Sequence, residues 1–203
     1  MPLRIILVRH GETEWNREYR IQGGSSDTPL NAEGRRQAEE LALRFADSKI
    51  QAIYSSPLRR ALGTAQAIAG RRNLEVIVEP ALREIEAGEL EGVTTAEMGI
   101  RFSDYMVEKG VDKKIPGGES LAEMQQRGWG FISRLAEKNK DGNIAVVSHY
   151  FVIMSTICAV LDIPLSSILR LRLSTGSISI ITFNGKDTRL ELFNDTGGLG
   201  RRL

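Results

Sequence analysis

Short apolar runs alternate along the chain with longer stretches whose apolar residues recur at helical spacing. Four of these runs, at 3–8, 52–54, 74–78 and 144–147, have the largely apolar character of strands buried on both faces. Two later runs, at 177–183 and 189–193, are joined through Asn184-Gly185 and predict a pair of late strands. Because strands and helices alternate, we expect one mostly parallel sheet with helices on both faces.

Helix start signals lie between these runs. Asn31 is a favourable cap for a helix to about residue 46, and Ser56-Pro57 has the cap-and-proline form of a helix start, for a helix to about residue 69. Thr94 and Ser120 each begin a capping box, the second before a long helix that ends near residue 138. The stretch 150–161 is apolar on all sides, which is typical of a buried central helix.

Composition narrows the class of protein. The 203 residues, 41% hydrophobic and 26% charged, predict a single globular domain over 1–203, with a C-terminal tail, 195–203, that we expect to be mobile. The net charge of +1 favours neither nucleic acid nor a membrane as a partner. His149 and several hydroxyl residues interrupt the uncharged stretch 144–161, so a buried strand and helix explain it better than a membrane span. The single cysteine, Cys158, and the absence of a visible secretory signal predict a cytoplasmic location.

Both histidines of the chain lie just past an apolar run that predicts a strand. His10 comes after the run 3–8, and His149 comes after the run 144–147. If these strands are parallel neighbours, both imidazoles emerge at the carboxyl edge of the sheet, where α/β proteins bind ligands. A lone histidine is commonly structural, but two at strand ends predict a functional site.

Arginines and carboxylates expected at the same edge complete a candidate anion site. Arg9 adjoins His10, and Arg59 falls in the first turn of the helix expected after the strand 52–54, where backbone N–H groups favour anions. Two guanidiniums can grip a phosphoryl group through paired hydrogen bonds. Glu84 and Glu86 both follow the strand 74–78, and their spacing alone does not choose between them.

Taken together, these residues resemble the signature of the histidine phosphatase superfamily. The resemblance rests on five motifs in family order between about residue 3 and about residue 161. The motifs are Arg9-His10-Gly11-Glu12-Thr13 with Trp15-Asn16; Gln22-Gly23 with Asp27-Thr28-Pro29-Leu30-Asn31 and Gly34; Ser55-Ser56-Pro57-Leu58-Arg59-Arg60 with Thr64-Ala65; Leu82-Arg83-Glu84 with Gly88 and Glu91-Gly92; and Gly117-Gly118-Glu119-Ser120-Leu121 followed by Ser148-His149. The resemblance implies a phosphoglycerate mutase-like fold, a three-layer α/β/α sandwich with a mostly parallel central sheet and one late edge strand that runs antiparallel.

The resemblance also implies roles for individual residues. His10 attacks phosphorus and forms a phosphohistidine, and Glu84 rather than Glu86 gives a proton to the leaving oxygen. The residues that hold the phosphoryl oxygens are Arg9, Arg59 and His149, and those that line the substrate pocket are Asn16, Gln22, Gly23 and Tyr150. The family chemistry needs no metal ion and no other cofactor.

Two departures from the family pattern bear on the substrate, which we expect to be a small phosphorylated metabolite. Tyr150-Phe151 stands where the family usually has Gly-Gly. Members that resemble metal-independent phosphoserine phosphatases also lack Gly-Gly at this position. However, Ala87 stands where those enzymes tend to have a histidine. Phosphoserine, α-ribazole phosphate, sugar phosphates and phosphoglycerates therefore all remain candidates. Late edge strands also make a homodimer a candidate assembly.

Three alternatives to a phosphatase follow from the same residues. A cofactor-dependent phosphoglycerate mutase would share the phosphohistidine, but the longer insertion that covers the site in such mutases is missing between Glu84 and His149. A non-catalytic phosphate-binding regulatory subunit is suggested by Tyr150-Phe151. A metallohydrolase that uses His10 and His149 is disfavoured, because two histidines lack the spacing of a recognisable metal site.

Overall fold

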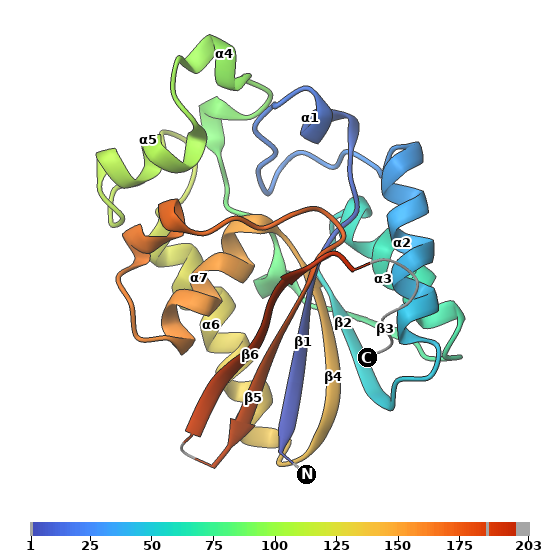
Figure 1. Ribbon diagram of the computed structural model, residues 1–203. Helices are drawn as coiled ribbons and strands as arrows, with labels where there is room; N and C mark the ends of the chain where they lie inside the picture. The colour runs from blue at the N-terminus through green and yellow to red at the C-terminus, as the bar shows by residue number, and fades with distance from the viewer. Residues whose placement is uncertain (1, 186, 198–203) are drawn as a thin grey trace.

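One sheet organises the part of the chain that the computed structural model describes, residues 2–185 and 187–197 (Figure 1). Six strands lie within these residues, in the spatial order β3-β2-β4-β1-β5-β6. Their bounds are Leu3–Arg9 (β1), Ile50–Ser55 (β2), Val76–Val78 (β3), Gly142–Ser148 (β4), Ile178–Asn184 (β5) and Asp187–Asp195 (β6). Every strand that the apolar runs predicted is present.

The sheet is mostly parallel, as predicted. β1, β2, β3 and β4 pair in parallel, whereas β5 is antiparallel to both β1 and β6. The reversed strand is therefore β5, next to the edge, while the edge strand β6 runs in the same direction as β1. β5 is reversed because the chain reaches it along the carboxyl edge, where Gly176 donates its N–H to the carbonyl of His10 (3.1 Å).

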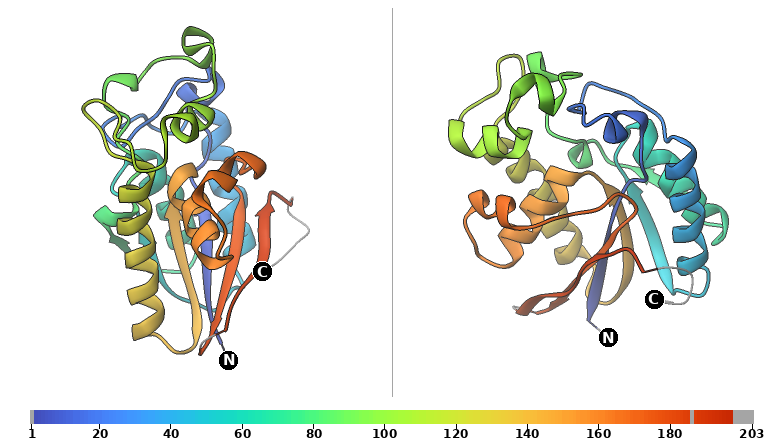
Figure 2. Two further views of the ribbon diagram at one scale, coloured as in Figure 1. Left: turned by 90° about the vertical axis from the view of Figure 1, so that its left-hand side faces the viewer. Right: turned by 45° about the horizontal axis from the view of Figure 1, so that its top comes forward.

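Helices cover both faces of the sheet, which confirms the predicted α/β/α sandwich (Figure 2). α2 (Ala32–Phe45) and α3 (Arg59–Gly70) lie on one face, and α6 (Leu121–Lys138) and α7 (Tyr150–Val160) lie on the other. Successive side chains of β1 alternate between the two faces, so Ile6 joins the core under α2 and α3 while Ile5 joins the core under α6 and α7.

The capping signals explain where most helices begin. Asn31 accepts a hydrogen bond from the N–H of Gly34 (2.8 Å), and Thr94 and Ser120 close the capping boxes of α4 (Thr95–Met98) and α6. α3 begins at Arg59 rather than at Pro57, because Leu58 keeps an extended backbone with ψ 136°. The hydroxyl of Ser56 instead serves a local turn and a histidine.

Short helices gather beyond the carboxyl ends of the parallel strands. Figure 1 shows α1, α4 and α5 above the sheet on this side. The short elements are α1 (Glu14–Arg17), α5 (Phe102–Lys109), η1 (Pro80–Leu82), η2 (Gly88–Leu90) and η3 (Leu165–Arg170). Of these short helices, α1, α4 and α5 line a cleft whose floor is the edge of the sheet.

The end of the described chain is anchored by an ion pair. Asp195 closes β6 and accepts a hydrogen bond from Arg44 (2.8 Å). Residues 198–203, which make up most of the tail predicted to be mobile, lie outside the described residues. No helix among residues 2–185 and 187–197 has the length and apolar character that crossing a membrane requires.

Candidate active site

His10 and His149 lie side by side at the carboxyl edge of the sheet. His10 directly follows β1, and His149 follows β4 as the N-cap residue of α7. Their ring centroids are 5.0 Å apart, their ring planes are inclined by 58°, and both side chains are buried. The parallel pairing of β1 with β4 brings the two rings to the same level, because Arg9 is in register with Ser148.

One ring nitrogen of His10 is held and the other is left free. Nδ1 lies 2.7 Å from the carbonyl oxygen of Gly11, so it carries the proton and leaves the lone pair on Nε2. Burial and the charges of Arg60 and Arg9 hold the pKa of His10 well below its usual range, so the ring is neutral near neutral pH. Gly11 must be glycine, because a Cβ there would lie 2.4 Å from the carbonyl oxygen of Gly34.

The two guanidiniums at the site belong to Arg9 and Arg60. Arg60 is fully buried and donates to the carbonyls of Ser26 (2.7 Å) and Gly23 (3.1 Å). Burial lowers its pKa to about 10, which still leaves it charged at neutral pH. Both guanidiniums line the cleft beside His10, and the Nε atom of each has no protein partner among the described residues.

Arg9 is oriented by a carbonyl and an aromatic ring. Its Nη1 donates to the carbonyl of Leu173 (2.7 Å), and its guanidinium carbon lies 5.3 Å from the centroid of the Tyr150 ring. Burial lowers the pKa of Arg9, and the nearby Glu84 carboxylate partly opposes this shift. Tyr150, predicted to line the substrate pocket, lines the cleft and supports Arg9 from below.

Arg59 does not reach the site, and its predicted role is wrong. Its side chain is exposed over a groove between α2 and α3, lined by residues such as Leu30 and Ala67. The prediction failed because it started the helix at Pro57. In the structure α3 starts two residues later, and successive helical residues turn by about 100°, which directs Arg60 rather than Arg59 to the cleft.

Glu84 is the carboxylate at the cleft. One of its oxygens accepts from the N–H of Ile85 (3.0 Å), and the N–H of Phe151 lies 3.3 Å from each oxygen. Burial raises the pKa of Glu84, while the backbone N–H groups and Arg60 partly offset this. Glu86 faces away and accepts from the hydroxyl of Ser25 (2.7 Å), so the structure separates the two carboxylates.

The second histidine is fixed by a serine, Ser56, that the sequence analysis assigned to a helix cap and not to the site. Nε2 of His149 lies 2.7 Å from Oγ of Ser56, and Oγ also accepts from the N–H of Leu58 (3.3 Å). The hydroxyl proton of Ser56 has no other acceptor among the described residues, so donation to Nε2 satisfies both groups and favours the His149 tautomer with its proton on Nδ1. Nδ1 is buried and has no protein partner in residues 2–185 and 187–197. Burial and the charge of Arg60 hold the pKa of His149 well below its usual range.

The residues predicted to line the substrate pocket fall into two groups. Asn16 and Gln22 line the cleft, and their amide oxygens accept from Thr13, at 3.1 Å from its N–H and 2.8 Å from its hydroxyl respectively. Their amide nitrogens make no protein hydrogen bond among the described residues, so they remain available as donors. Gly23 lies beneath the cleft, where its carbonyl fixes Arg60.

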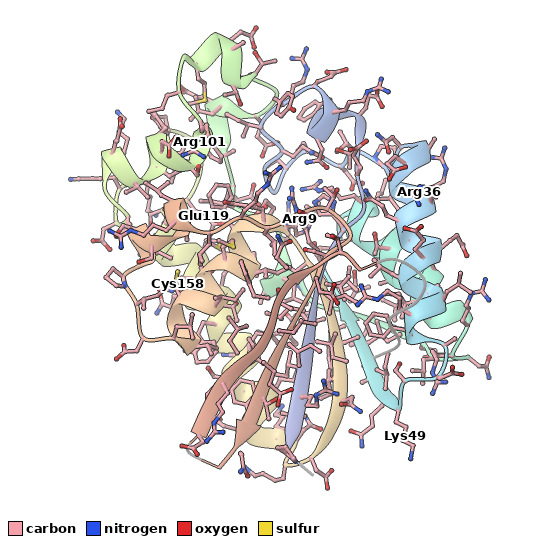
Figure 3. All side chains as sticks on the ribbon, viewed as in Figure 1. Arg9, Arg36, Lys49, Arg101, Glu119 and Cys158 are labelled. Carbon is pink, nitrogen blue, oxygen red and sulfur yellow. The ribbon has the colours of Figure 1, made fainter. Side chains whose placement is uncertain are left out.

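The cleft has a volume of about 720 Å³, and His10 is among its lining residues. Its outer part is lined by aromatic residues and by three further arginines: Trp15, Tyr19, Phe102, Arg20, Arg101 and Arg172. Figure 3 shows Arg9 at the strand ends and Arg101 above it, next to α5. No three His, Cys, Asp or Glu side chains of the described chain are grouped so that they could hold a metal ion.

Comparisons with known proteins agree with this geometry. The sequence pattern of the histidine phosphatase superfamily (branch 1) matches residues 5–196. The chain belongs to this superfamily. The motifs predicted this membership, and phosphomonoester hydrolysis is the activity that the superfamily and the relatives below support.

Individual relatives of the chain include both a phosphatase and a probable mutase. Phosphoserine phosphatase 1 of Hydrogenobacter thermophilus is 34% identical over 201 residues, which cover 98% of this chain and 95% of that protein. The probable phosphoglycerate mutase GpmB of Proteus mirabilis is 36% identical over 184 residues, 89% of this chain and 85% of that one. The crystal structure of phosphoserine phosphatase from Entamoeba histolytica, in complex with 3-phosphoglyceric acid, matches with a TM-score of 0.87 at 32% identity, covering 97% and 99% of the two chains.

Proposed function

We propose that this phosphatase hydrolyses small phosphomonoesters through a phosphohistidine on His10, without a metal ion. One observation carries the proposal: the neutral His10 ring is held through Nδ1 by the Gly11 carbonyl, with the Nε2 lone pair free beside two guanidiniums and a buried carboxyl group. An imidazole in this state is a nucleophile, and its surroundings suit a phosphoryl group.

In the first step, Nε2 of His10 attacks phosphorus while the bond from phosphorus to the ester oxygen breaks. The departing oxygen takes the bonding electron pair, and the carboxyl group of Glu84 supplies its proton. Burial keeps Glu84 protonated to a higher pH than an exposed glutamate, which suits it to this role. The products are phosphohistidine, the free alcohol and the Glu84 carboxylate.

In the second step, water attacks the phosphohistidine. The Glu84 carboxylate takes a proton from this water, the bond from phosphorus to Nε2 breaks, and its electron pair returns to the imidazole. Inorganic phosphate leaves, and both His10 and Glu84 regain their starting protonation states. One difficult displacement is thereby divided into two easier ones.

Arg9, Arg60 and His149 complete what we call the phosphate cradle together with His10. The two guanidiniums neutralise charge on the phosphoryl oxygens, and the Nδ1–H of His149 donates to one of them. The free amide nitrogens of Asn16 and Gln22 are placed at the cleft wall to add two neutral donors. Because these groups are held by protein hydrogen bonds before substrate arrives, they need little rearrangement.

We further propose that the substrate carries a second anionic group, such as a carboxylate. Among the arginines of the outer cleft, Arg20 pairs with Glu18 (2.6 Å) and Arg101 with Asp104 (2.6 Å), whereas Arg172 has no acidic partner among the described residues. Phosphoserine and phosphoglycerates fit this charge pattern better than neutral sugar phosphates. The names of the relatives, a phosphoserine phosphatase and a probable phosphoglycerate mutase, support the same class.

A panel assay tests these proposals. Purified protein is given phosphoserine, 3-phosphoglycerate, α-ribazole phosphate and a neutral sugar phosphate, each with EDTA present. Release of inorganic phosphate, fastest from a carboxylated substrate and abolished by vanadate, is the expected result. Turnover that requires 2,3-bisphosphoglycerate would establish the mutase instead, binding of phosphate without turnover would establish a regulatory subunit, and loss of activity in EDTA would establish a metallohydrolase.

The expectations about the assembly and the cellular location also stay proposals. We propose a homodimer joined along β6, because this edge strand pairs with β5 on one side only. Light scattering during size-exclusion chromatography tests it, and a monomer at micromolar concentration would contradict it. We also propose a cytoplasmic location, which cell fractionation tests directly.

A further inference from the structure

One arginine of α6 binds the backbone around Glu84 at three points. Nη1 of Arg127 donates to the carbonyls of Ala81 (2.9 Å) and Arg83 (2.6 Å), and Nη2 donates to the carbonyl of Glu84 itself (2.9 Å). We call residues 81–86 the acid loop. Its only regular structure is the end of the short helix η1, so these hydrogen bonds replace the ones that a longer helix or a strand would supply.

Glu119 forms hydrogen bonds both to Arg127 and to Glu86, the last residue of the acid loop. Its carboxylate accepts from Nε (3.1 Å) and Nη2 (2.5 Å) of Arg127, and it also accepts from the N–H of Glu86 (3.0 Å). The N–H of Glu119 in turn donates to the carbonyl of Glu86 (3.0 Å). Figure 3 labels Glu119, which lies on the side of α6 and α7. The two side chains are 26% and 16% exposed, so water competes weakly for these bonds.

The glycine before Glu119 allows this close approach. A Cβ on Gly118 would lie 2.1 Å from the carbonyl oxygen of Glu86, so any other residue would push the two segments apart. The motif 117–121, which the sequence resemblance included without a role, therefore forms the support for the acid loop.

We propose that Arg127 and Glu119 are positioning residues that place the Glu84 carboxyl group for proton transfer to the leaving oxygen. The inference rests on the proposed function, in which Glu84 is the general acid. A proton donor must lie within hydrogen-bond reach of the oxygen that it protonates, and small displacements are costly. The planar guanidinium of Arg127 has several N–H donors and binds three carbonyls at once. The ammonium group of a lysine does not offer this arrangement of donors.

Leaving-group dependence separates positioning from general stabilisation. A poor leaving group such as an alkoxide needs the proton from Glu84, whereas p-nitrophenolate leaves without it. A misplaced carboxyl group should thus impair alkyl phosphates and spare p-nitrophenyl phosphate. Loss of packing or of the phosphate cradle would impair both substrates equally.

The experiment compares kcat/KM for glycerol 2-phosphate and p-nitrophenyl phosphate, since this ratio reports the first chemical step. For Arg127→Met we expect a loss of about 10²-fold with the alkyl phosphate, comparable with the contribution of a general acid, and a change below about threefold with the aryl phosphate. The vanadate inhibition constant should not change. Arg134→Met alters an exposed arginine on the same helix and should leave both substrates unaffected.

Four results would overturn or separate the claims. Equal losses with both substrates, or no loss with either, would overturn the positioning role of Arg127. Arg127→Lys, which keeps a cation, should show the same selectivity to a smaller extent, and it decides the question if Arg127→Met does not fold. Glu84→Gln measured in parallel should show the selectivity in full. If it does not, then the proposed function fails at Glu84; if it does and neither Arg127 variant does, then only the positioning proposal fails.

Discussion

Oγ of Ser56 lies 2.7 Å from Nε2 of His149, although the two residues are 93 positions apart in the chain. The same oxygen accepts from the N–H of Leu58, and the imidazole is the acceptor within reach of its proton among the described residues. The serine thereby selects the tautomer of His149 that carries its proton on Nδ1. This is the same tautomer that the carbonyl of Gly11 selects for His10.

Both histidines should consequently give the ¹⁵N signature of an Nδ1–H imidazole near neutral pH. The chain contains two histidines, so selective ¹⁵N-histidine labelling yields one resonance set for each ring. Ser56→Ala should change the signals of His149, leave those of His10 in place, and lower kcat/KM by up to about tenfold, the upper range for one lost hydrogen bond between neutral groups. Ser56→Thr keeps a hydroxyl and should restore both readouts. An unaltered His149 spectrum in Ser56→Ala would remove the serine from this role.

A matched pair of variants tests which arginine of the pair Arg59-Arg60 serves the site. Arg60→Met should lower kcat/KM by about 10²- to 10³-fold, because a buried donor to the phosphoryl group is lost. Arg59→Met, which changes an exposed side chain by the same chemistry, should alter kcat/KM by less than about threefold. Similar losses in the two variants would contradict the assignment. Circular dichroism of both proteins checks that each is folded.

The pH dependence of kcat/KM should reveal Glu84 on its alkaline side. Glu84 acts in its protonated form, and burial raises its pKa, so activity falls as the pH rises through that raised value. His10 acts in its neutral form and has a lowered pKa, so the acidic limb lies below the usual value of about 6.5. Glu84→Gln should lose the alkaline limb and keep the acidic one. The substrate ionises identically in both experiments, so an alkaline limb that persists unchanged would assign the acid to another group.

Arg172 should control the preference for a second anionic group on the substrate. Arg172→Met is expected to raise KM for phosphoserine about tenfold, with a much smaller effect on p-nitrophenyl phosphate, which has no carboxylate. Arg170→Met, two residues earlier on η3, supplies a control arginine that does not line the cleft. Equal effects of Arg172→Met on the two substrates would argue against a carboxylate contact.

The two buried histidines should make the folded state less stable in mild acid. Their pKa values are well below 6.5 in the folded protein, so the unfolded chain binds more protons as the pH falls through about 6.5. The free energy of unfolding should then decrease, by up to about 1.4 kcal/mol per pH unit for each histidine. Urea unfolding between pH 7.5 and 5.5 measures it, in a Glu84→Gln background that removes the carboxyl group with the opposite pH effect. His10→Asn should roughly halve the slope, and an unchanged slope would show that His10 is not buried in its neutral form.

Strand and helix positions were largely predictable because local signals carry them. The apolar run before His10 and the cap at Asn31 each depend on neighbouring residues only, and both agree with the structure. The start of α3 was not predictable from its cap signal, because the hydroxyl of Ser56 is used by a histidine from a distant strand. A tertiary contact therefore decided a local boundary.

The correct arginine was nevertheless visible in the sequence pattern. Arg60, Thr64 and Ile68 recur every four residues and share the buried face of α3 with small apolar neighbours. Arg59 falls off that face. The hydrophobic spacing of the whole helix was thus a better guide to the site than its first two residues were.

The roles of Arg127 and Glu119 had no comparable signal. Their contacts join side chains to backbone carbonyls or N–H groups more than 30 residues away, and such contacts follow no periodicity. Which backbone groups these two side chains contact can be seen only in the folded structure.

One wall of the outer cleft comes from one short stretch of backbone. Thr95, Arg101, Phe102 and Ser103 line the outer cleft from a single segment, whereas strand ends and a helix start supply the phosphate cradle. After a gene duplication, changes confined to this stretch could redirect one copy to a new metabolite while the dephosphorylation step, common to every substrate, stays intact. Diversification of the kind seen in the names of the relatives then needs few substitutions and no redesign of the reaction.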